Sequence, residues 1–364
     1  MSSKPAILLC AGGTGGHLFP AQAVAWELKS RGYEIHLAAD ERVDRFAGDF
    51  PAKEIHTVKS ASIGSKNPLK LVKSLFGLMA GYRQSMKLLR RISPVAAIGF
   101  GGYPTVPPIF AASRYGIPTM VHEANAVPGR ANKLLFRFVR LMAIGCGSAY
   151  KGKNERIIVT GNPVRPPVLE ASNEVYPDRN ASDPFNLLIF GGSQGAAYFG
   201  EIVPKACALL DGEIRKRLRL TLQARPEDIE TVRAEISNVG ITAEIESFYG
   251  DMAERIAQAH LVMSRSGAST VSELSVIGRP SILIPYPYAL DHDQAMNAKS
   301  VENAGGAQVI VQSDLTVERL ASEITAAINE PKRLATAAKN AKKTGIANAS
   351  VVVADCIEQL INEQ

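Results

Sequence analysis

The chain of 364 residues contains only four cysteines, Cys10, Cys146, Cys207 and Cys356. They lie far apart and form no C-x-x-C pair, which argues against a structural zinc site and against the disulfide framework of a small secreted domain. This scarcity of cysteine fits a protein that works in a reducing, cytoplasmic environment.

Long apolar runs are also missing. No stretch of about 18 consecutive apolar residues occurs, so the sequence predicts no membrane-spanning helix. The first residues, Met-Ser-Ser-Lys-Pro, lead directly into an apolar strand pattern, so we also expect no signal peptide. Any membrane contact should therefore be peripheral.

Acidic residues are absent from one long segment. Between Ile55 and His122 there is no Asp or Glu, but there are nine Lys and Arg residues. The net charge of the whole chain is +6, so the remainder of the chain is net acidic. This asymmetry predicts a basic surface in the first half of the chain.

Within the basic segment, residues 68–92 have the periodicity of a helix. The stripe expected to face the sheet consists of Leu71, Leu75, Leu78, Tyr82 and Leu89. A second apolar set, about a third of a turn away, consists of Val72, Phe76 and Met79 and borders Lys73, Arg83 and Lys87. This pattern is typical either of a basic amphipathic membrane surface or of a solvated basic face beside a wide core stripe. Nucleic acid is a less favoured partner, because no nucleic-acid-binding fold or aromatic platform accompanies the charge.

Apolar residues make up 46% of the chain, enough for two domains with a full core each. Strand, loop and helix patterns alternate throughout, which predicts α/β architecture with helices on both faces of parallel sheets. The strands expected in the first half are 6–10, 34–38, 95–98, 119–121, 141–144 and 157–159. Those expected in the second half are 187–190, 218–222, 243–245, 261–263, 281–284 and 308–311.

A polar stretch at 170–184 interrupts this rhythm and indicates a domain boundary. We expect two doubly wound, Rossmann-like domains, residues 1–164 and 165–342, with a C-terminal helix at 343–364 that packs back on the first domain.

The sequence Gly-Gly-Thr-Gly-Gly-His at 12–17 joins the first strand to the first helix. Its four glycines allow a tight turn and let a ligand lie against the backbone, while the helix start offers N–H groups to an electron-rich group. His17 adds a titratable side chain at the mouth of this loop. The alternative is a turn that is glycine-rich only because it is tight.

A dinucleotide fingerprint is the first hypothesis for such a loop, with Asp40 as the carboxylate that binds the ribose. The spacing does not support it, because the third glycine of G-x-G-x-x-G would fall on His17 or Leu18. Hydride transfer therefore remains a weaker alternative.

Two further glycine turns follow predicted strands. Gly-Gly-Ser-Gln-Gly-Ala at 191–196, which contains Ser193, repeats the first loop in the second half, and Gly-Phe-Gly-Gly-Tyr at 99–103 lies in the first half. Ligands of open α/β sheets bind beyond the carboxyl ends of the strands. If the two domains face each other, these loops should line one cleft.

The densest polar cluster, residues 264–273, lies at another passage from strand to helix. Backbone N–H groups and the hydroxyls of Ser269 and Thr270 could hold a diphosphate, and Glu273 could accept hydrogen bonds from a ribose diol. Alternatively, Ser266 caps the helix and Glu273 is an ordinary exposed residue. The Asp-His-Asp sequence at 291–293 could suggest a metal, but a carboxylate at a helix start is also a common N-cap, and we expect neither metal nor cofactor.

The motifs that together carry a family resemblance are Gly-Gly-Thr-Gly-Gly-His (12–17), Gly-Phe-Gly-Gly-Tyr (99–103), His-Glu-Ala-Asn (122–125), Gly-Asn-Pro-Val-Arg (161–165), Gly-Gly-Ser-Gln-Gly-Ala (191–196), Ser-Arg-Ser-Gly-Ala-Ser-Thr-Val-Ser-Glu (264–273) and Asp-x-x-Gln-x-x-Asn-Ala (291–298). In this order they resemble the MurG family of peptidoglycan glycosyltransferases. The resemblance implies a GT-B fold and transfer of N-acetylglucosamine from its UDP donor to lipid I, undecaprenyl-pyrophosphoryl-N-acetylmuramoyl pentapeptide, to form lipid II. Two places depart from the family pattern, Ala124 and the pair Thr105-Val106.

The resemblance also implies roles for individual residues. Those expected to contact UDP-N-acetylglucosamine are Thr14, Gly15, Gly16 and Asn125 beside the transferred sugar, Gln294 at the sugar hydroxyls, Arg165 and Ser193 elsewhere on the donor, Tyr249 beside the uracil, and Ala268, Ser269, Thr270, Val271, Ser272 and Glu273 at the diphosphate and ribose. The implied reaction is inverting, and the C4 hydroxyl of the acceptor must lose its proton to a base. His17 is the candidate base, with Glu123 as its competitor.

A lipid acceptor gives the basic helix at 68–92 a reason to bind a membrane. The residues expected to contact an anionic membrane surface are Val72, Lys73, Phe76, Met79 and Lys87. The implied location is the cytoplasmic face of the inner membrane, as a peripheral protein, with other cell-wall synthesis proteins as further partners. Alternative functions are another GT-B-like sugar-nucleotide enzyme, such as an epimerase or a glycolipid synthase, and a nicotinamide oxidoreductase.

Overall fold

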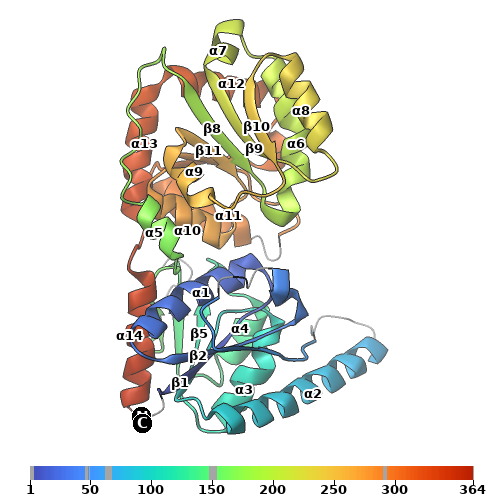
Figure 1. Ribbon diagram of the computed structural model, residues 1–364, viewed down its shortest axis with the longest axis vertical. Coiled ribbons are helices and arrows are strands. Elements are labelled where there is room, and N and C mark those ends of the chain that lie inside the picture. Colours follow the sequence, from blue (N-terminus) through green and yellow to red (C-terminus); the bar gives the residue numbers. More distant parts are fainter. Residues whose placement is uncertain are drawn as a thin grey trace. The chain divides into compact units, whose positions relative to one another are not determined.

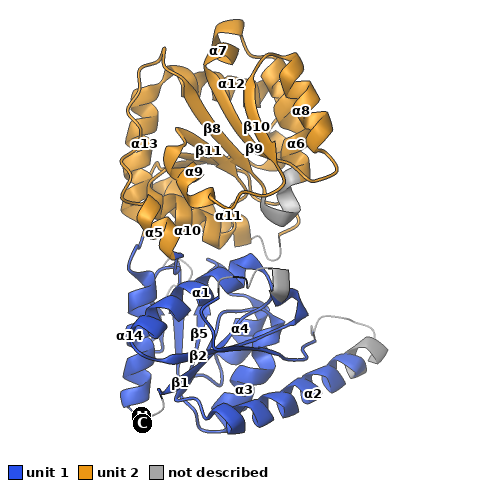
Figure 2. Cartoon of the chain, viewed as in Figure 1, with its two compact units in different colours: residues 1–165, 346–364 blue, residues 166–345 orange. Residues whose placement is uncertain are grey.

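The computed structural model describes residues 4–45, 48, 50–61, 68–146, 154–289 and 293–363; at 44, 45, 68–72 and 192–196 it describes the backbone alone. The chain divides into two compact units. Unit 1 comprises Met1–Arg165 and Ile346–Gln364, and unit 2 comprises Pro166–Gly345 (Figure 2). Each unit is built on one parallel sheet (Figure 1).

Unit 1 contains a seven-stranded sheet in the order β3-β2-β1-β4-β5-β6-β7. Its strands are β1 Ala6–Cys10, β2 Glu34–Ala39, β3 Glu54–Thr57, β4 Ala96–Gly99, β5 Thr119–Glu123, β6 Leu141–Ile144 and β7 Ile157–Val159. Strand β3 was not predicted, because this short edge strand has the sequence Glu-Ile-His-Thr, which contains one aliphatic residue. The predicted strands of this half are all present.

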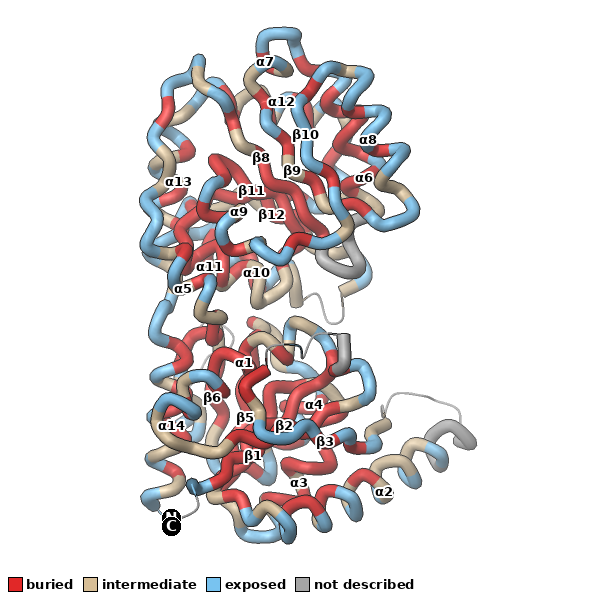
Figure 3. The backbone as a smooth tube through the Cα atoms, in the orientation of Figure 1, coloured by how far each residue is buried: buried red, intermediate tan, exposed pale blue. Residues whose placement is uncertain are grey.

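Helices cover both faces of the unit 1 sheet. They are α1 Gly15–Ser30, α2 Pro68–Ile92, α3 Val106–Arg114, α4 Arg130–Leu135 and α14 Ala349–Asn362, with the 3-10 turns η1 Glu41–Arg45 and η2 Tyr103–Thr105. Ile7 and Leu9 of β1 face a core shared with α1 and α14, whereas Leu8 and Cys10 face a core shared with α2 and α3. The central strands of the sheet are buried (Figure 3), and burial on both faces explains why they are continuously apolar.

One stretch of the described chain, Pro331–Asn362, is long and apolar enough to cross a membrane by composition. It consists of two helices, α13 Pro331–Thr344 in unit 2 and α14 in unit 1. The apolar side of α14 is occupied by core contacts with α1, through Val353, Ala354 and Ile357. The stretch is therefore two separate helices, and the apolar side of α14 is used in packing within unit 1.

Unit 2 repeats the same design with a six-stranded sheet in the order β10-β9-β8-β11-β12-β13. Its strands are β8 Phe185–Phe190, β9 Leu218–Gln223, β10 Thr242–Glu246, β11 Leu261–Ser264, β12 Ser281–Leu283 and β13 Ala307–Val309. Its helices besides α13 are α5 Pro166–Ala171, α6 Gly192–Ala208, α7 Gly212–Arg217, α8 Ile229–Asn238, α9 Met252–Gln258, α10 Ala268–Ile277, α11 Asp293–Asn303 and α12 Val317–Asn329, with the 3-10 turn η5 Gln312–Asp314. Two doubly wound, Rossmann-like parallel-sheet units confirm the predicted fold class.

Helix α2 has the predicted extent, but one part of the predicted inner stripe is wrong. Leu88 and Leu89 are buried, whereas Leu75 is 55% exposed. The helix packs tightly only from about Gly81 onward, where a Cβ atom would lie 2.0 Å from the carbonyl oxygen of Lys59. Figure 1 shows the N-terminal half extending beyond α3, so Leu75 has no sheet to cover. The side chain of Leu71 lies outside the described part of the structure.

The second apolar set predicted for α2 does lie on its outer side, as far as its side chains are described. Phe76 is 69% exposed and Met79 is 50% exposed, and the neighbouring Lys73 and Lys87 are also exposed. The side chain of Val72 lies outside the described part of the structure.

Candidate functional site

The connections of unit 1 leave the sheet in opposite directions from β1 and β4, because the strand order reverses between these neighbours. Such a switch point is where open α/β sheets bind ligands. The glycine turn after β1 and the glycine turn after β4 meet there, and the amide of Gly12 donates to the carbonyl oxygen of Gly101 at 3.1 Å.

His17 lies in the first turn of α1, between these two turns. Its Nδ1 atom is 3.1 Å from the hydroxyl oxygen of Thr14. A Cβ atom on Gly101, whose φ is +98°, would lie 2.9 Å from the ring, and one on Gly12 would lie 3.1 Å from Nδ1. Glycine is therefore needed at both positions so that the imidazole can lie against bare backbone.

The surroundings keep His17 neutral. The pKa of His17 is lowered to about 4, chiefly by burial and also by the nearby Arg42 cation, while Asp40 partly opposes both effects. Asp40 is itself held by Arg42, whose guanidinium donates to its carboxylate at 2.6 and 2.9 Å. Because Arg42 occupies this carboxylate, Asp40 is poorly suited to the ribose-binding role that the dinucleotide hypothesis gave it.

Glu123, at the end of β5, is buried and accepts hydrogen bonds on both oxygens. One oxygen accepts from the backbone and side-chain N–H groups of Asn125 at 3.0 and 3.3 Å. The other accepts from the amide of Gly129 at 2.8 Å and from the side chain of Asn132 at 2.9 Å. Burial raises the pKa of Glu123, and these hydrogen bonds oppose the rise. The carboxylate therefore fixes the loop that carries Asn125, and its lone pairs are largely committed.

Asn132, on α4, is a site residue that sequence reasoning missed. It donates to both Glu123 and the carbonyl oxygen of His122, at 2.9 and 3.0 Å, and its amide nitrogen would be 3.5 Å from a Cβ on Gly101. It thus connects the Glu123 loop to the turn beside His17. A single asparagine in an unpredicted short helix gives no motif that could have revealed it.

Arg165 also reaches this part of unit 1. Its guanidinium lies over the ring of Phe19, 4.1 Å from the centroid. The ring of Phe19 in turn packs against Gly15, where an added Cβ atom would lie 2.9 Å from the ring. Unit 1 therefore brings Arg165 next to the loop of Thr14, Gly15 and Gly16, although they are far apart in the sequence.

In unit 2 the strand order reverses between β8 and β11. The loop after β11 leads into α10, whose N-cap is Gly267 and whose first turn has no side-chain cap. The alternative in which Ser266 caps this helix is therefore wrong. The buried hydroxyls of Ser266 and Ser269 have no hydrogen-bond partner among the described residues. Uncapped N–H groups with such hydroxyls are the chemistry of an anion site.

The other residues of α10 that were predicted to bind the UDP-sugar differ in how far they are buried. Ala268, Thr270 and Ser272 are half-buried, and Val271 is buried. Glu273 is buried one turn into the helix, which excludes its being an ordinary exposed residue. The structure gives the backbone of Ser193 in α6 but not its side chain, and Asp291 and His292 lie outside the described residues.

Gln294, on α11, joins two loops of unit 2. Its Oε1 atom accepts from the amides of Ser266 and Tyr286 at 3.2 and 2.9 Å. Asn297, one turn later, donates to the carbonyl oxygen of Ser266 at 3.3 Å. Since Oε1 serves the loops, a hydrogen bond from Gln294 to a sugar hydroxyl has to come from its Nε2 group.

The side chain of Tyr249 faces the interior. It is 5% exposed, its hydroxyl donates to the backbone at Glu244, and Arg255 lies 4.3 Å over its ring. Burial raises the pKa of Tyr249 to about 12. Only the backbone of Tyr249 can therefore border a base, whereas the adjacent Phe248 is 76% exposed and was passed over by sequence reasoning.

Arg265 is a second residue of unit 2 that the sequence did not single out. This buried guanidinium donates to the carbonyl oxygen of Ile284 at 3.2 Å and to the side chain of Gln312 at 2.7 Å. It also lies about 5 Å from the rings of Tyr198, Phe199 and Tyr286. It places a positive charge just before the start of α10.

Comparison with known proteins identifies the family. Residues 7–144 match the N-terminal domain of glycosyltransferase family 28, and residues 186–353 match its C-terminal domain. The chain is 53% identical to a protein of Rhizobium etli (strain CIAT 652) over 98% of this chain and 96% of that one, and 53% identical to one of Agrobacterium fabrum over 98% and 95%. Both are named UDP-N-acetylglucosamine--N-acetylmuramyl-(pentapeptide) pyrophosphoryl-undecaprenol N-acetylglucosamine transferase.

Solved structures agree. The crystal structure of Acinetobacter baumannii MurG is 28% identical, with a TM-score of 0.79 over 98% of this chain and 100% of that one. A UDP-GlcNAc 2-epimerase from Neisseria meningitidis, 15% identical with a TM-score of 0.66 over 97% and 100%, shares the fold alone. The chain belongs to the MurG family of N-acetylglucosamine transferases, within glycosyltransferase family 28, and is an enzyme of GT-B fold.

Proposed function

We propose that this enzyme transfers N-acetylglucosamine from UDP-N-acetylglucosamine to the C4 hydroxyl of lipid I, with inversion, to make lipid II for peptidoglycan synthesis. The names of relatives 52–54% identical over almost the whole chain support the two substrates. The structural observation that carries the proposal is the neutral His17 between two glycine turns at the switch point of unit 1.

Unit 2 binds the donor in this proposal. The diphosphate lies at the uncapped start of α10 with the hydroxyl of Ser269, and the ribose diol donates to Glu273. Gln294 contacts the sugar through Nε2, and the backbone at Tyr249 borders the uracil. Additional contacts with the donor come from Ser193 and Arg165. The transferred sugar is bordered by Thr14, Gly15, Gly16 and Asn125.

Unit 1 activates the acceptor. His17 is neutral at neutral pH, so one ring nitrogen can take the proton of the attacking C4 hydroxyl as the bond to the anomeric carbon forms and the bond to UDP breaks. The negative charge that develops on the departing UDP is stabilised by the helix N-terminus and by the nearby Arg265. Glu123 holds Asn125 and the adjoining loop in place rather than taking the proton, because both its oxygens already accept hydrogen bonds.

A transfer assay tests this proposal directly. Incubation with radiolabelled UDP-N-acetylglucosamine and a lipid I analogue should give a labelled disaccharide lipid and free UDP. Isomerisation of the donor without an acceptor would indicate an epimerase instead. A change in nicotinamide absorbance would indicate an oxidoreductase, the alternative least compatible with the Asp40–Arg42 pair.

Replacing Glu273 with alanine should weaken the binding of UDP and of UDP-N-acetylglucosamine equally, because both contain the ribose diol. The expected loss is about 1–3 kcal/mol, the cost of leaving polar partners unpaired. Titration calorimetry with both ligands measures it. Glu235→Ala, at an exposed position on α8 of the same unit, is the matched control and should bind as the parent does. Unchanged UDP affinity in Glu273→Ala would contradict the ribose assignment.

We further propose that α2 docks the enzyme on the cytoplasmic face of the inner membrane, where other cell-wall synthesis proteins would be its neighbours. The exposed Phe76 and Met79 beside exposed Lys73 and Lys87 support this, because they offer an apolar and a cationic contact together. Anionic lipid attracts each nearby basic residue by about 1 kcal/mol, and insertion of the apolar side chains adds a hydrophobic contribution.

Charge reversal in Lys73→Glu/Lys87→Glu should release the protein from anionic vesicles, because the binding free energy should become less favourable by at least roughly 2 kcal/mol. Parent binding should also fall as salt rises, because surface charges are screened within about 8–10 Å. Phe76→Ser should weaken binding with less salt dependence. Vesicle sedimentation measures both effects, and Lys332→Glu/Lys339→Glu on α13 is the control. A water-soluble acceptor should still be glycosylated by each variant. If both α2 variants bind like the parent, the helix is a solvated basic face.

A further inference from the structure

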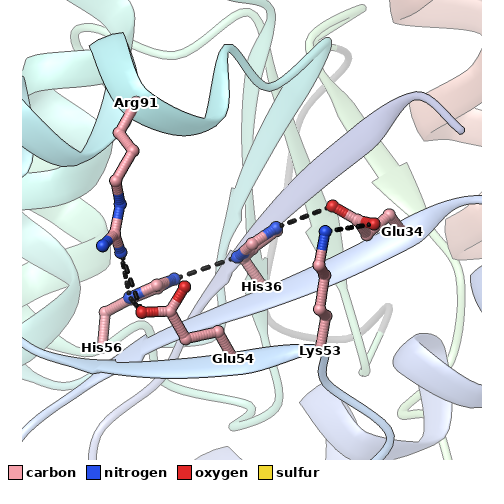
Figure 4. Close-up of polar contacts among 6 residues, drawn as sticks. All are labelled: Glu34, His36, Lys53, Glu54, His56 and Arg91. Carbon is pink, nitrogen blue, oxygen red and sulfur yellow. Dashed lines mark hydrogen bonds and ion pairs between the residues drawn. The ribbon is translucent and has the colours of Figure 1, made fainter. Parts of the chain in front are cut away.

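The face of β2 and β3 that α2 covers holds a polar cluster outside the site described above. In the register of these parallel strands His36 is paired with Glu54, and Ala38 with His56. Since side chains alternate along a strand, Glu34, His36, Glu54 and His56 share this face. Lys53 and Arg91 complete the cluster, which Figure 4 shows.

Two imidazoles face each other in this cluster. Nδ1 of His36 is 3.0 Å from Nε2 of His56, and both side chains are buried. Two backbone strands, rather than loops, hold the two rings, so their separation is well fixed. The side chain of Glu54, 49% exposed, lies beside them and leaves a way in from solvent.

The shorter contacts favour one arrangement of the hydrogens on the two rings. Arg91 can only donate, so in this arrangement Nδ1 of His56 accepts from its guanidinium at 3.1 Å, although the Glu54 carboxylate also lies 3.3 Å from the same nitrogen. Nε2 of the neutral His56 then donates to Nδ1 of His36. Nε2 of His36 donates to Glu34 at 3.2 Å. The pair of nitrogens that face each other therefore shares one hydrogen, which a metal ion could replace.

We propose that His36, Glu54 and His56 form a binding site for a zinc-like divalent cation. One ligand atom from each lies within 4.8 Å of the others. Tetrahedral zinc with nitrogen ligands at about 2.0–2.1 Å separates neighbouring ligand atoms by roughly 3.3 Å, so the 3.0 Å gap between the imidazoles needs to open only slightly. Two imidazoles with one carboxylate favour zinc over magnesium or calcium, and water can complete the coordination at the exposed side.

The surroundings of His36 already have the form of an outer coordination shell. A histidine that binds a metal usually donates its other ring N–H to a carboxylate, which orients the ring and makes it a better ligand. The hydrogen bond from His36 to Glu34 does this, and Lys53 fixes Glu34 through a contact of 2.8 Å.

Arg91 opposes the cation and gives the proposal a distinctive signature. Its guanidinium is 2.9 Å from Glu54 and occupies the outer nitrogen of His56. Metal binding moves the remaining hydrogen of His56 to Nδ1, so Arg91 has to withdraw. Arg91 is more than half exposed at the end of α2 and is free to turn towards solvent.

The test uses the full-length chain, freed of metal by dialysis against a chelator, and titrates Zn²⁺ in competition with a chromophoric chelator. Co²⁺ is titrated in parallel and followed by its visible absorption. We expect one equivalent to bind, with a rise in Tm because the ion joins the edge strand β3 to β2. Loss of an outer-shell partner weakens metal binding roughly 10- to 100-fold, so loss of a direct ligand in Glu54→Gln should weaken binding by at least about 10-fold, and in His56→Gln by at least about 100-fold. Arg91→Leu should tighten it roughly 3- to 5-fold, because a nearby like charge is removed.

Glu244→Gln is the matched control, since Glu244 lies on the edge strand of the other sheet, is 50% exposed and is also paired with an arginine. It should bind Zn²⁺ like the parent. Should His56→Gln fail to fold, the half-exposed Glu54→Gln and Arg91→Leu still decide the matter. The proposal is overturned if the parent binds no equivalent, if Glu54→Gln leaves the affinity unchanged, or if Arg91→Leu weakens binding.

Discussion

Replacing His17 with alanine should lower the rate of sugar transfer about 10²- to 10⁴-fold, the usual contribution of a general base. UDP affinity should change little, because in the proposed mechanism the UDP part of the donor is held mainly by groups of unit 2, and His17 is not among the groups that hold it. Steady-state rates with a soluble lipid I analogue, together with UDP calorimetry, separate the two effects. Removal of the imidazole leaves only a small gap between the two glycine turns, so the fold should survive the substitution.

The pH dependence of the parent enzyme adds an independent check. The base must be unprotonated, and the pKa of His17 is lowered to about 4, so the rate should hold well below neutral pH and fall as the pH approaches about 4. Arg42→Gln removes a cation that lowers this pKa and leaves Asp40, which raises it. The acidic limb should therefore move to higher pH in that variant.

Glu123→Gln distinguishes the competing base. A glutamine amide nitrogen cannot accept the hydrogen bonds that one carboxylate oxygen now receives, so we expect a loss of stability of about 1–3 kcal/mol and a disordered Asn125 loop. Its activity should fall less than that of His17→Ala once folding is complete. A full loss in Glu123→Gln combined with near-normal turnover in His17→Ala would make the carboxylate the base.

Gly101→Ala should lower the transfer rate by roughly 10²-fold, although residue 101 itself carries no reactive group. The new Cβ would lie 2.9 Å from the His17 ring, which must shift, and displacement of a catalytic group by about 1 Å has an effect of that size. The φ of +98° adds a backbone cost of about 1–3 kcal/mol to folding.

Gly116→Ala is the matched control for backbone strain. Gly116 has a φ of +84°, but a Cβ there would meet no atom within 4 Å. Both variants should lose similar stability in thermal melts, and only Gly101→Ala should lose activity. Equal activities in the two variants would show that contact between residue 101 and the ring does not position His17.

Sequence pattern alone was enough for the two parallel sheets and for most of their strands. Strands buried on both faces must be continuously apolar, and glycine turns at strand ends are visible without coordinates, as at 12–16 and 99–103. Helix α2 was located correctly for the same reason, since its periodicity is long and clear. Edge strand β3 was not, because an edge strand needs few apolar residues.

Only the tertiary structure decided what the individual side chains do. Periodicity assigned Leu75 to the core, but it cannot say where a helix stops covering its sheet, and the structure leaves that residue exposed. Motif position placed Tyr249 beside a base, but its side chain packs inside because Glu244 and Arg255 provide its partners there.

The same holds for residues that no motif marks. Asn132 and Arg265 acquire their roles from contacts with segments distant in the chain. His36 and His56, twenty residues apart, face each other only because β2 and β3 pair in one particular register. The sequence by itself determined the fold class and the positions of the glycine-rich turns at the strand ends, since these depend on local pattern. The tertiary structure decided charge state, orientation and partnership, since these depend on burial and on which distant groups come within hydrogen-bonding distance.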